Sequence, residues 1–115
     1  MRIVAAPALI LAMLALVVAP AHAAVNGFTV VNQTGGALTD LALRRIGDPT
    51  WQSVNVAASP AASARVNFAH KDCAFDLRAN IAGVGPILWS GVNLCDVKRV
   101  TLNRDSSGRH WVDYD

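Results

Sequence analysis

The sequence predicts an all-β fold, a small antiparallel sandwich of about 7–8 strands with one disulfide. Short apolar or alternating runs begin near residues 26, 38, 51, 63, 73, 87, 99 and 111. Every separator between them contains Gly, Pro, Asn or Asp, the residues that turns favour. Short runs at regular spacing, separated by turn residues, are typical of antiparallel sandwiches and barrels.

Alternation within the runs indicates strands with one buried face. In "SARVNFA", Val66 and Phe68 point to one face of the strand, and the polar residues Arg65 and Asn67 point to the other. The runs "CAFDLRANI" and "KRVTLN" repeat this pattern, which is typical of a sheet covered on one side only. The single helix-like stretch, "VAASPAASA", is interrupted by Pro60 and is predicted to be a loop.

The N-terminus has the pattern of a signal peptide. Arg2 precedes an apolar run over residues 3–18, and Ala21 and Ala23 match the A-x-A rule for cleavage. We therefore predict a signal peptide over residues 1–23, a β-sandwich domain over residues 24–115, and a periplasmic or extracellular location. The alternative is an uncleaved anchor, but the apolar run is shorter than the ~20 residues that a spanning helix needs.

Size and charge restrict the functional classes. The chain of 115 residues has a formal net charge of +2, and its basic residues form no run longer than a pair such as Arg44-Arg45. This balance excludes a typical nucleic-acid binder. All eight acidic residues are aspartates, which suit turns and strand ends better than helices.

The two cysteines, Cys73 and Cys95, predict one disulfide. An even number of cysteines in a chain bound for an oxidising compartment is typical of a bridge. The segment "HKDC" that ends at Cys73 has an alternative interpretation as part of a metal or thiol site. No C-x-x-C or H-x-x-x-H spacing supports that alternative, so we predict a polar turn that ends in the disulfide.

The register of the hairpin between the cysteines has two solutions. A hairpin centred on Val84 places the two cysteines directly opposite each other. However, Val92 and Leu94 differ in parity from Trp89, and a bulge at Ser90-Gly91 corrects this difference. The bulge moves the second cysteine out of simple register, so that the bridge forms from the strand end.

Three motifs resemble those of small exported bacterial β-sandwich proteins of unknown function. The stretches "FTVVNQTGGALTDL", "CAFDLRA" and "GVNLCDVKRVTL" match the patterns F-x-V-x-N-x-T, C-x-x-D-L-R-A and V-x-L-C of that group. The resemblance covers most of residues 27–102 and implies a small disulfide-linked sandwich, but no activity and no catalytic residue. It assigns no role to Trp51, Trp111 or Tyr114.

No catalytic set is evident, so enzymatic activity is uncertain and no catalytic residue is assigned. Ser90 lies in "LWSGV", which lacks the first glycine of G-x-S-x-G. His70 and His110 are candidate bases, and Asp113 and Asp115 are candidate paired carboxylates at a chain end. A hydrolase with serine or aspartate chemistry remains an alternative.

Cofactors and metals are not predicted. The stretch "NRDSSG" resembles the start of an EF-hand loop, but Tyr114 stands where that loop requires a glutamate. A hairpin turn therefore explains the stretch better than a cation site. Asn32-Gln33-Thr34 is a glycosylation sequon, and the same residues are ordinary turn formers.

The leading functional hypothesis is a secreted, non-enzymatic sandwich that binds a protein or an envelope component. The alternative is a carbohydrate- or peptidoglycan-binding module with exposed tryptophans, and the candidate ligand surface is Trp51, Trp111 and Arg78. Trp89 falls among core-facing residues and is predicted to be buried. For Trp51 and Trp111, core filling is favoured over a binding platform. The sequence predicts no oligomeric state.

Overall fold

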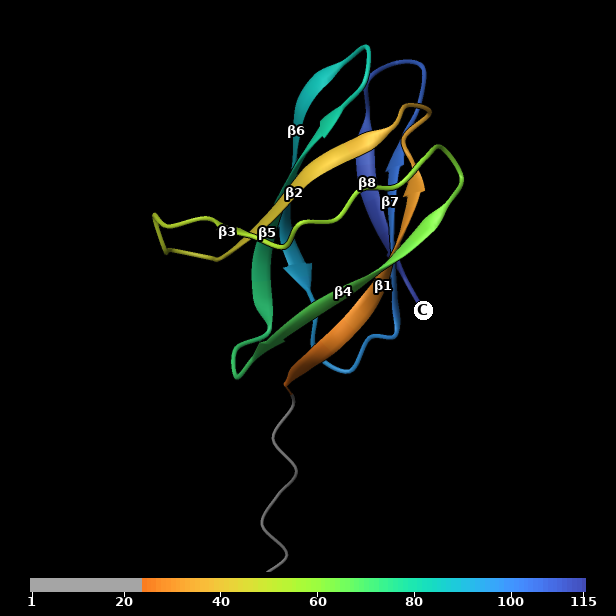
Figure 1. Cartoon of the computed structure of the whole chain (residues 1–115). Helices are drawn as coiled ribbons and strands as arrows, with labels where there is room; N and C mark the ends of the chain where they lie inside the picture. The colour runs from red at the N-terminus through yellow and green to blue at the C-terminus, as the bar shows by residue number, and fades with distance from the viewer. Residues whose placement is uncertain (1–23) are drawn as a thin grey trace, which may run out of the picture.

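The computed structural model describes residues 24–115 as a sandwich of two four-stranded sheets (Figure 1). Sheet A has the strand order β4-β1-β7-β8, and sheet B has the order β3-β2-β5-β6. The predicted all-β fold is therefore confirmed. The strands are β1 (Val25–Gln33), β2 (Leu38–Arg45), β3 (Gln52–Ser53), β4 (Ser63–His70), β5 (Ala74–Ile81), β6 (Gly85–Asn93), β7 (Arg99–Arg104) and β8 (His110–Tyr114).

One strand pair within the described residues is parallel. β1 runs parallel to β7, with Val30 opposite Val100, whereas the other pairs of named strands are antiparallel. A parallel pair needs a long connection, and here the chain forms all of sheet B and β4 between the two strands. β1 and β7 therefore form the centre of sheet A, while β4 and β8 are its edges.

The core lies between the two sheets and is built from the inward positions of the alternating runs. Val66 and Phe68 of β4 are buried, as the alternation predicts, and the alternate residues Arg65 and Asn67 are exposed. The loop before β4, which contains Pro60, has the predicted non-helical structure. The largest fully buried side chains are Val25, Phe28, Val30, Val66 and Leu102 from sheet A, Leu38, Leu41, Leu43, Phe75, Leu77 and Ile81 from sheet B, and Leu94, which follows β6.

The predicted signal peptide, residues 1–23, lies outside the described residues. Within residues 24–115, no helix is long and apolar enough to cross a membrane.

Candidate functional site

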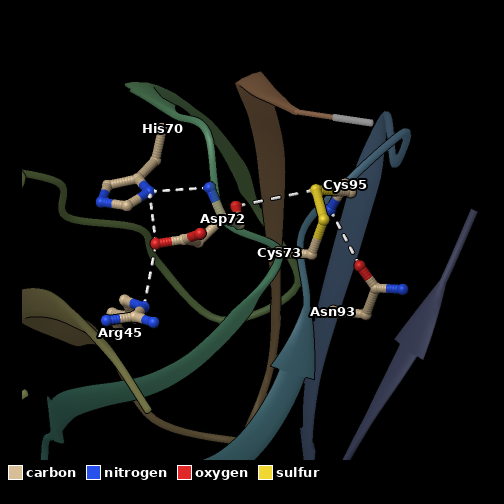
Figure 2. Close-up of a disulfide and its surroundings, with 6 residues drawn as sticks. All are labelled: Arg45, His70, Asp72, Cys73, Asn93 and Cys95. Atoms are coloured by element: carbon tan, nitrogen blue, oxygen red, sulfur yellow. Dashed lines mark hydrogen bonds and ion pairs between the residues drawn. A yellow bond between two sulfur atoms is a disulfide. The ribbon is translucent and has the colours of Figure 1, made fainter. Parts of the chain in front are cut away.

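The "HKDC" segment is a turn between β4 and β5 that ends in the disulfide (Figure 2). The N–H of Asp72 donates to Nδ1 of His70 at 2.9 Å, and the Asp72 carboxylate pairs with Nε of Arg45 at 2.8 Å. Cys73 is bonded to Cys95, with their Cα atoms 4.9 Å apart. The predicted turn and disulfide are confirmed, and residues 24–115 contain no group of three metal-ligating side chains.

The hairpin register follows the bulged solution. The β5–β6 hairpin is centred one residue before Val84, and its register shifts where β6 passes through Ser90-Gly91. Beyond this bulge, the N–H of Leu94 donates to the carbonyl of Cys73 at 2.9 Å. The bridge to Cys95 therefore joins the strand ends rather than a directly opposed pair.

Asn32, the asparagine of the F-x-V-x-N-x-T motif, is a buried structural residue. Its Nδ2 donates to the carbonyls of Gly36 at 2.8 Å and Ala58 at 3.0 Å. Its Oδ1 accepts from the backbone N–H of Thr34 at 3.1 Å and from the Thr34 hydroxyl at 2.5 Å. These hydrogen bonds join the turn after β1 to the loop before β4, and the Asn32 side chain is 0% exposed. Turn chemistry, not glycan attachment, explains this stretch in the folded chain.

Asp76 lies on the polar face of β5 but is nearly buried, at 6% exposure. Its carboxylate accepts from the Ser90 hydroxyl at 2.7 Å, the Gly91 N–H at 3.2 Å and Nε of Arg44 at 3.0 Å. The β6 bulge supplies two of these donors, and Gly91 adopts a φ of 69° there. Three strands of sheet B are therefore joined through one carboxylate.

These contacts determine the pKa of Asp76. Burial by itself raises the pKa, because it disfavours the charged carboxylate. The hydrogen bonds from Ser90, Arg44 and the Gly91 N–H together outweigh burial, so the pKa lies below its ordinary value of 3.8. The ionised form of Asp76 is the form that stabilises the fold.

We expect Asp76→Asn to lower the free energy of unfolding at neutral pH by about 1–3 kcal/mol. A lowered folded pKa stabilises the protein above the unfolded pKa, near 4, and this contribution disappears as pH falls through the folded pKa. Urea unfolding at several pH values between about 7 and 2.5 should show the difference from wild type shrinking with acid. Asp96→Asn, at an exposed position, is the matched control. If the difference in the free energy of unfolding between wild type and Asp76→Asn did not change with pH, the lowered pKa assigned to Asp76 would be wrong.

Trp51 lies on the outer face of sheet B against two arginines. Its ring centroid is 4.5 Å from Cζ of Arg44 and 4.3 Å from Cζ of Arg78, distances at which cations and aromatic rings attract. The ring is half-buried beneath these side chains, so the core-filling prediction is wrong for Trp51. Trp89 is 2% exposed, as predicted. The structure thus brings Trp51 and Arg78 together but places Trp111 in β8, in the other sheet.

A groove of about 810 Å³ lies between the edge strand of sheet B, β6, and the edge strand of sheet A, β8. The turns that precede these strands lie at the same end of the sandwich (Figure 1). The groove is within the size range of ordinary ligand pockets. Its lining residues are Val84, Pro86, Ile87, Leu88, Trp89, Ser90, Val92, Arg104, Gly108, His110, Trp111, Val112 and Tyr114.

Exposed apolar side chains gather at this groove. Of the five large apolar residues that are exposed in the described chain, four line it: Val84, Leu88, Trp111 and Tyr114, at 40–47% exposure. The fifth, Ile46, is not part of the groove. The core-filling prediction is therefore also wrong for Trp111. Its neighbour Val112 pairs with the buried Leu102 and packs against the core, so alternation places Trp111 on the opposite face of sheet A. Apolar side chains that cluster in a concave surface are typical of a binding site.

Three contacts join β6 to β7 and β8 at the groove. The N–H of Asn93 in β6 donates to Oη of Tyr114 in β8 at 2.9 Å. The indole Nε1–H of Trp89 donates to the carbonyl of Asn103 at 3.4 Å, and the ring of His110 packs edge-on against Trp89 with centroids 6.0 Å apart. These contacts hold β6 close to β7 and β8 where the groove lies.

The candidate catalytic residues are not arranged for nucleophilic catalysis. Ser90 and His110 both line the groove, but the Ser90 hydroxyl donates to Asp76 rather than to a ring nitrogen. His70 lies at the disulfide turn, where its Nδ1 accepts from Asp72. Within residues 24–115 no serine hydroxyl donates to a histidine, the contact that activation of a serine requires.

The "NRDSSG" stretch is the turn between β7 and β8. The Asp105 carboxylate accepts from the N–H groups of Ser107 and Arg109, at 3.0 and 3.1 Å, and from the Ser107 hydroxyl. The hydrogen bond from Ser107 is the main cause that lowers the pKa of Asp105. The predicted hairpin turn is confirmed, and the Asp105 carboxylate accepts hydrogen bonds from donors within that turn.

Comparisons with known proteins support the fold. No protein-family model and no curated protein matches the chain. A solved structure, described as the NMR structure of the protein from Eubacterium rectale, is similar with a TM-score of 0.53 and 17% sequence identity. The similarity covers 77% of this chain and 86% of that chain. At this identity the likeness establishes a shared fold and no shared activity.

Proposed function

We propose that this domain is exported and non-enzymatic, and that it binds another protein or an envelope component in the groove between β6 and β8. The supporting observation is that Val84, Leu88, Trp111 and Tyr114 gather there, whereas the exposed apolar side chains of a monomer are normally scattered singly over its surface. The disulfide is compatible with an oxidising, exported location.

A carbohydrate-binding module is the second candidate, and one observation favours it. Trp111 is 40% exposed in the groove, where a sugar ring has access to its indole. Trp51 supports this role less well, because two guanidinium groups lie 4.3 and 4.5 Å from its ring centroid, whereas the guanidinium group of Arg109 lies 5.5 Å from that of Trp111. Arg78 pairs with Leu88 across β5 and β6, so the Trp51 surface adjoins the groove.

The test compares the groove with a matched exposed position outside it. Leu88 is 41% exposed in the groove, and Ile46 is 46% exposed elsewhere, so Leu88→Asp and Ile46→Asp introduce the same change at similar cost to folding. Each immobilised variant is incubated with envelope protein extract and, separately, with solubilised peptidoglycan fragments. We expect a protein that binds wild type and Ile46→Asp but binds Leu88→Asp at least tenfold more weakly.

Retention of peptidoglycan fragments with the same dependence on Leu88 would favour the carbohydrate module instead. Equal binding by all three proteins would show that the groove is not the binding surface. Thermal unfolding of each variant separates a lost contact from a lost fold.

A further inference from the structure

Within residues 24–115, the outer edge of β8 carries backbone groups that have no partner in the sheet. The N–H groups of Asp115 and Arg99 donate to each other's carbonyls, at 3.0 and 3.2 Å, and the N–H of Asp105 donates to the carbonyl of Arg109 at 2.9 Å. Hydrogen-bonded and non-hydrogen-bonded pairs alternate in an antiparallel ladder. The even-numbered residues of β8 therefore direct their N–H and C=O groups away from β7. These residues are His110, Val112 and Tyr114.

The opposite edge of the groove, β6, is unsuited to strand pairing. Pro86 has no N–H, and the bulge at Ser90-Gly91 interrupts the regular repeat of backbone groups. The N–H of Asn93 already donates to Oη of Tyr114. In the part of the chain that the structure describes, the edge of β8 is therefore the ladder in this groove with which an added strand can pair.

The charges of the groove favour an acidic occupant. Arg104 is the one charged side chain among its lining residues, which include no aspartate. Among residues 24–115, Arg104 takes part in no ion pair. An acidic side chain held near Arg104 would gain a charge-assisted contact, whereas a lysine there would be repelled.

We infer that the groove takes an extended, acidic peptide segment, which pairs with β8 as an added strand of sheet A. The sheet order becomes β4-β1-β7-β8-peptide, and alternate apolar side chains of the peptide contact Leu88 and the rest of the apolar lining. This inference rests on the proposed function and adds the conformation and charge of the bound segment.

Short, terminally blocked peptides test the inference. Each alternates valine with serine and carries either glutamate or lysine at both ends, and a third peptide is the glutamate form with alternate backbone nitrogens methylated. Titration is followed by tryptophan fluorescence and by amide hydrogen exchange at His110, Val112 and Tyr114. We expect the glutamate peptide to bind and to slow exchange at these amides, and the other two to bind at least tenfold more weakly. Arg104→Glu should reverse the preference between glutamate and lysine.

Two substitutions at Val112 separate backbone pairing from packing. The N–H of Val112 points away from β7, so Val112→Pro removes a donor that the fold does not use. Val112→Ala shortens the same side chain and keeps the N–H. We expect Val112→Pro to weaken binding of the glutamate peptide about tenfold relative to Val112→Ala. If the Val112→Pro variant is poorly folded, the inference is tested instead by whether Arg104→Glu reverses the preference between the glutamate and lysine peptides.

The outcomes distinguish this inference from the proposed function. If the envelope protein depends on Leu88 but no peptide binds, or if Val112→Pro and Arg104→Glu have no effect, strand addition is wrong while the groove remains a binding surface. If wild type sediments as a dimer and Val112→Pro as a monomer, the edge belongs to a second copy of this chain, and the inference is overturned. If no binding depends on Leu88, the proposed function itself fails.

Discussion

Asn32→Asp is expected to destabilise the domain by about 3–5 kcal/mol, a large part of the stability of a small domain. The Asn32 amide donates to the carbonyls of Gly36 and Ala58, and a carboxylate cannot donate to either. The new negative charge would face two carbonyl oxygens at a position that is 0% exposed. Equilibrium urea unfolding at neutral pH measures the loss.

The control for this substitution is Asn67→Asp, which makes the same chemical change at an exposed position of β4. It should change the free energy of unfolding by no more than about 0.5 kcal/mol. The loss at Asn32 should shrink in acid, because a protonated carboxyl group can donate one hydrogen bond. An Asn32→Asp variant as stable as wild type would refute the structural role assigned to the F-x-V-x-N-x-T motif.

Removal of the disulfide is expected to lower the free energy of unfolding by about 3 kcal/mol. The bridge closes a loop between residues 22 apart in sequence and so restricts the unfolded chain. A domain of this size buries a modest core, so a covalent link contributes a large share of its net stability. The double variant Cys73→Ala/Cys95→Ala, unfolded in urea beside the wild type, measures the effect.

Two further measurements accompany that experiment. Wild type treated with a reductant should fall to the stability of the double variant, because both lack the same bridge. The intact mass of the exported wild type should equal that of a chain that begins at Ala24. It should show no alkylation under non-reducing conditions. Alkylation of both thiols would contradict the bridge, and a mass that includes residues 1–23 would contradict the predicted cleavage.

Much of the fold could be predicted from the sequence, because alternation in a strand reports directly which face is buried. In β4, Val66 and Phe68 are buried as their spacing indicates, and the same holds for Val100 and Leu102 in β7. The bulge at Ser90-Gly91 was detectable too, since it repairs a change of parity within one run. These features depend on residues that are neighbours along the chain.

The surroundings of individual polar and aromatic residues could not be predicted in this way. The alternating pattern places Asp76 on a polar face and gives no sign that Ser90 and Arg44, from two flanking strands, enclose it. Trp51 looked like a core residue, yet two arginines on adjacent strands hold it against the outer face of sheet B. In each case the deciding partner is distant in sequence.

The all-β class, the strands and the cysteine pair follow from the sequence, because hydrophobic periodicity, turn residues and the number of cysteines can be read directly along the chain. Which strands are edges, and therefore that Leu88 and Trp111 line the same groove, depends on the tertiary structure. The parallel pairing of β1 with β7 leaves β8 at the edge of sheet A, next to β6 at the edge of sheet B. Strand order arises from contacts between the sheets, and a groove exists only once both edges are in place.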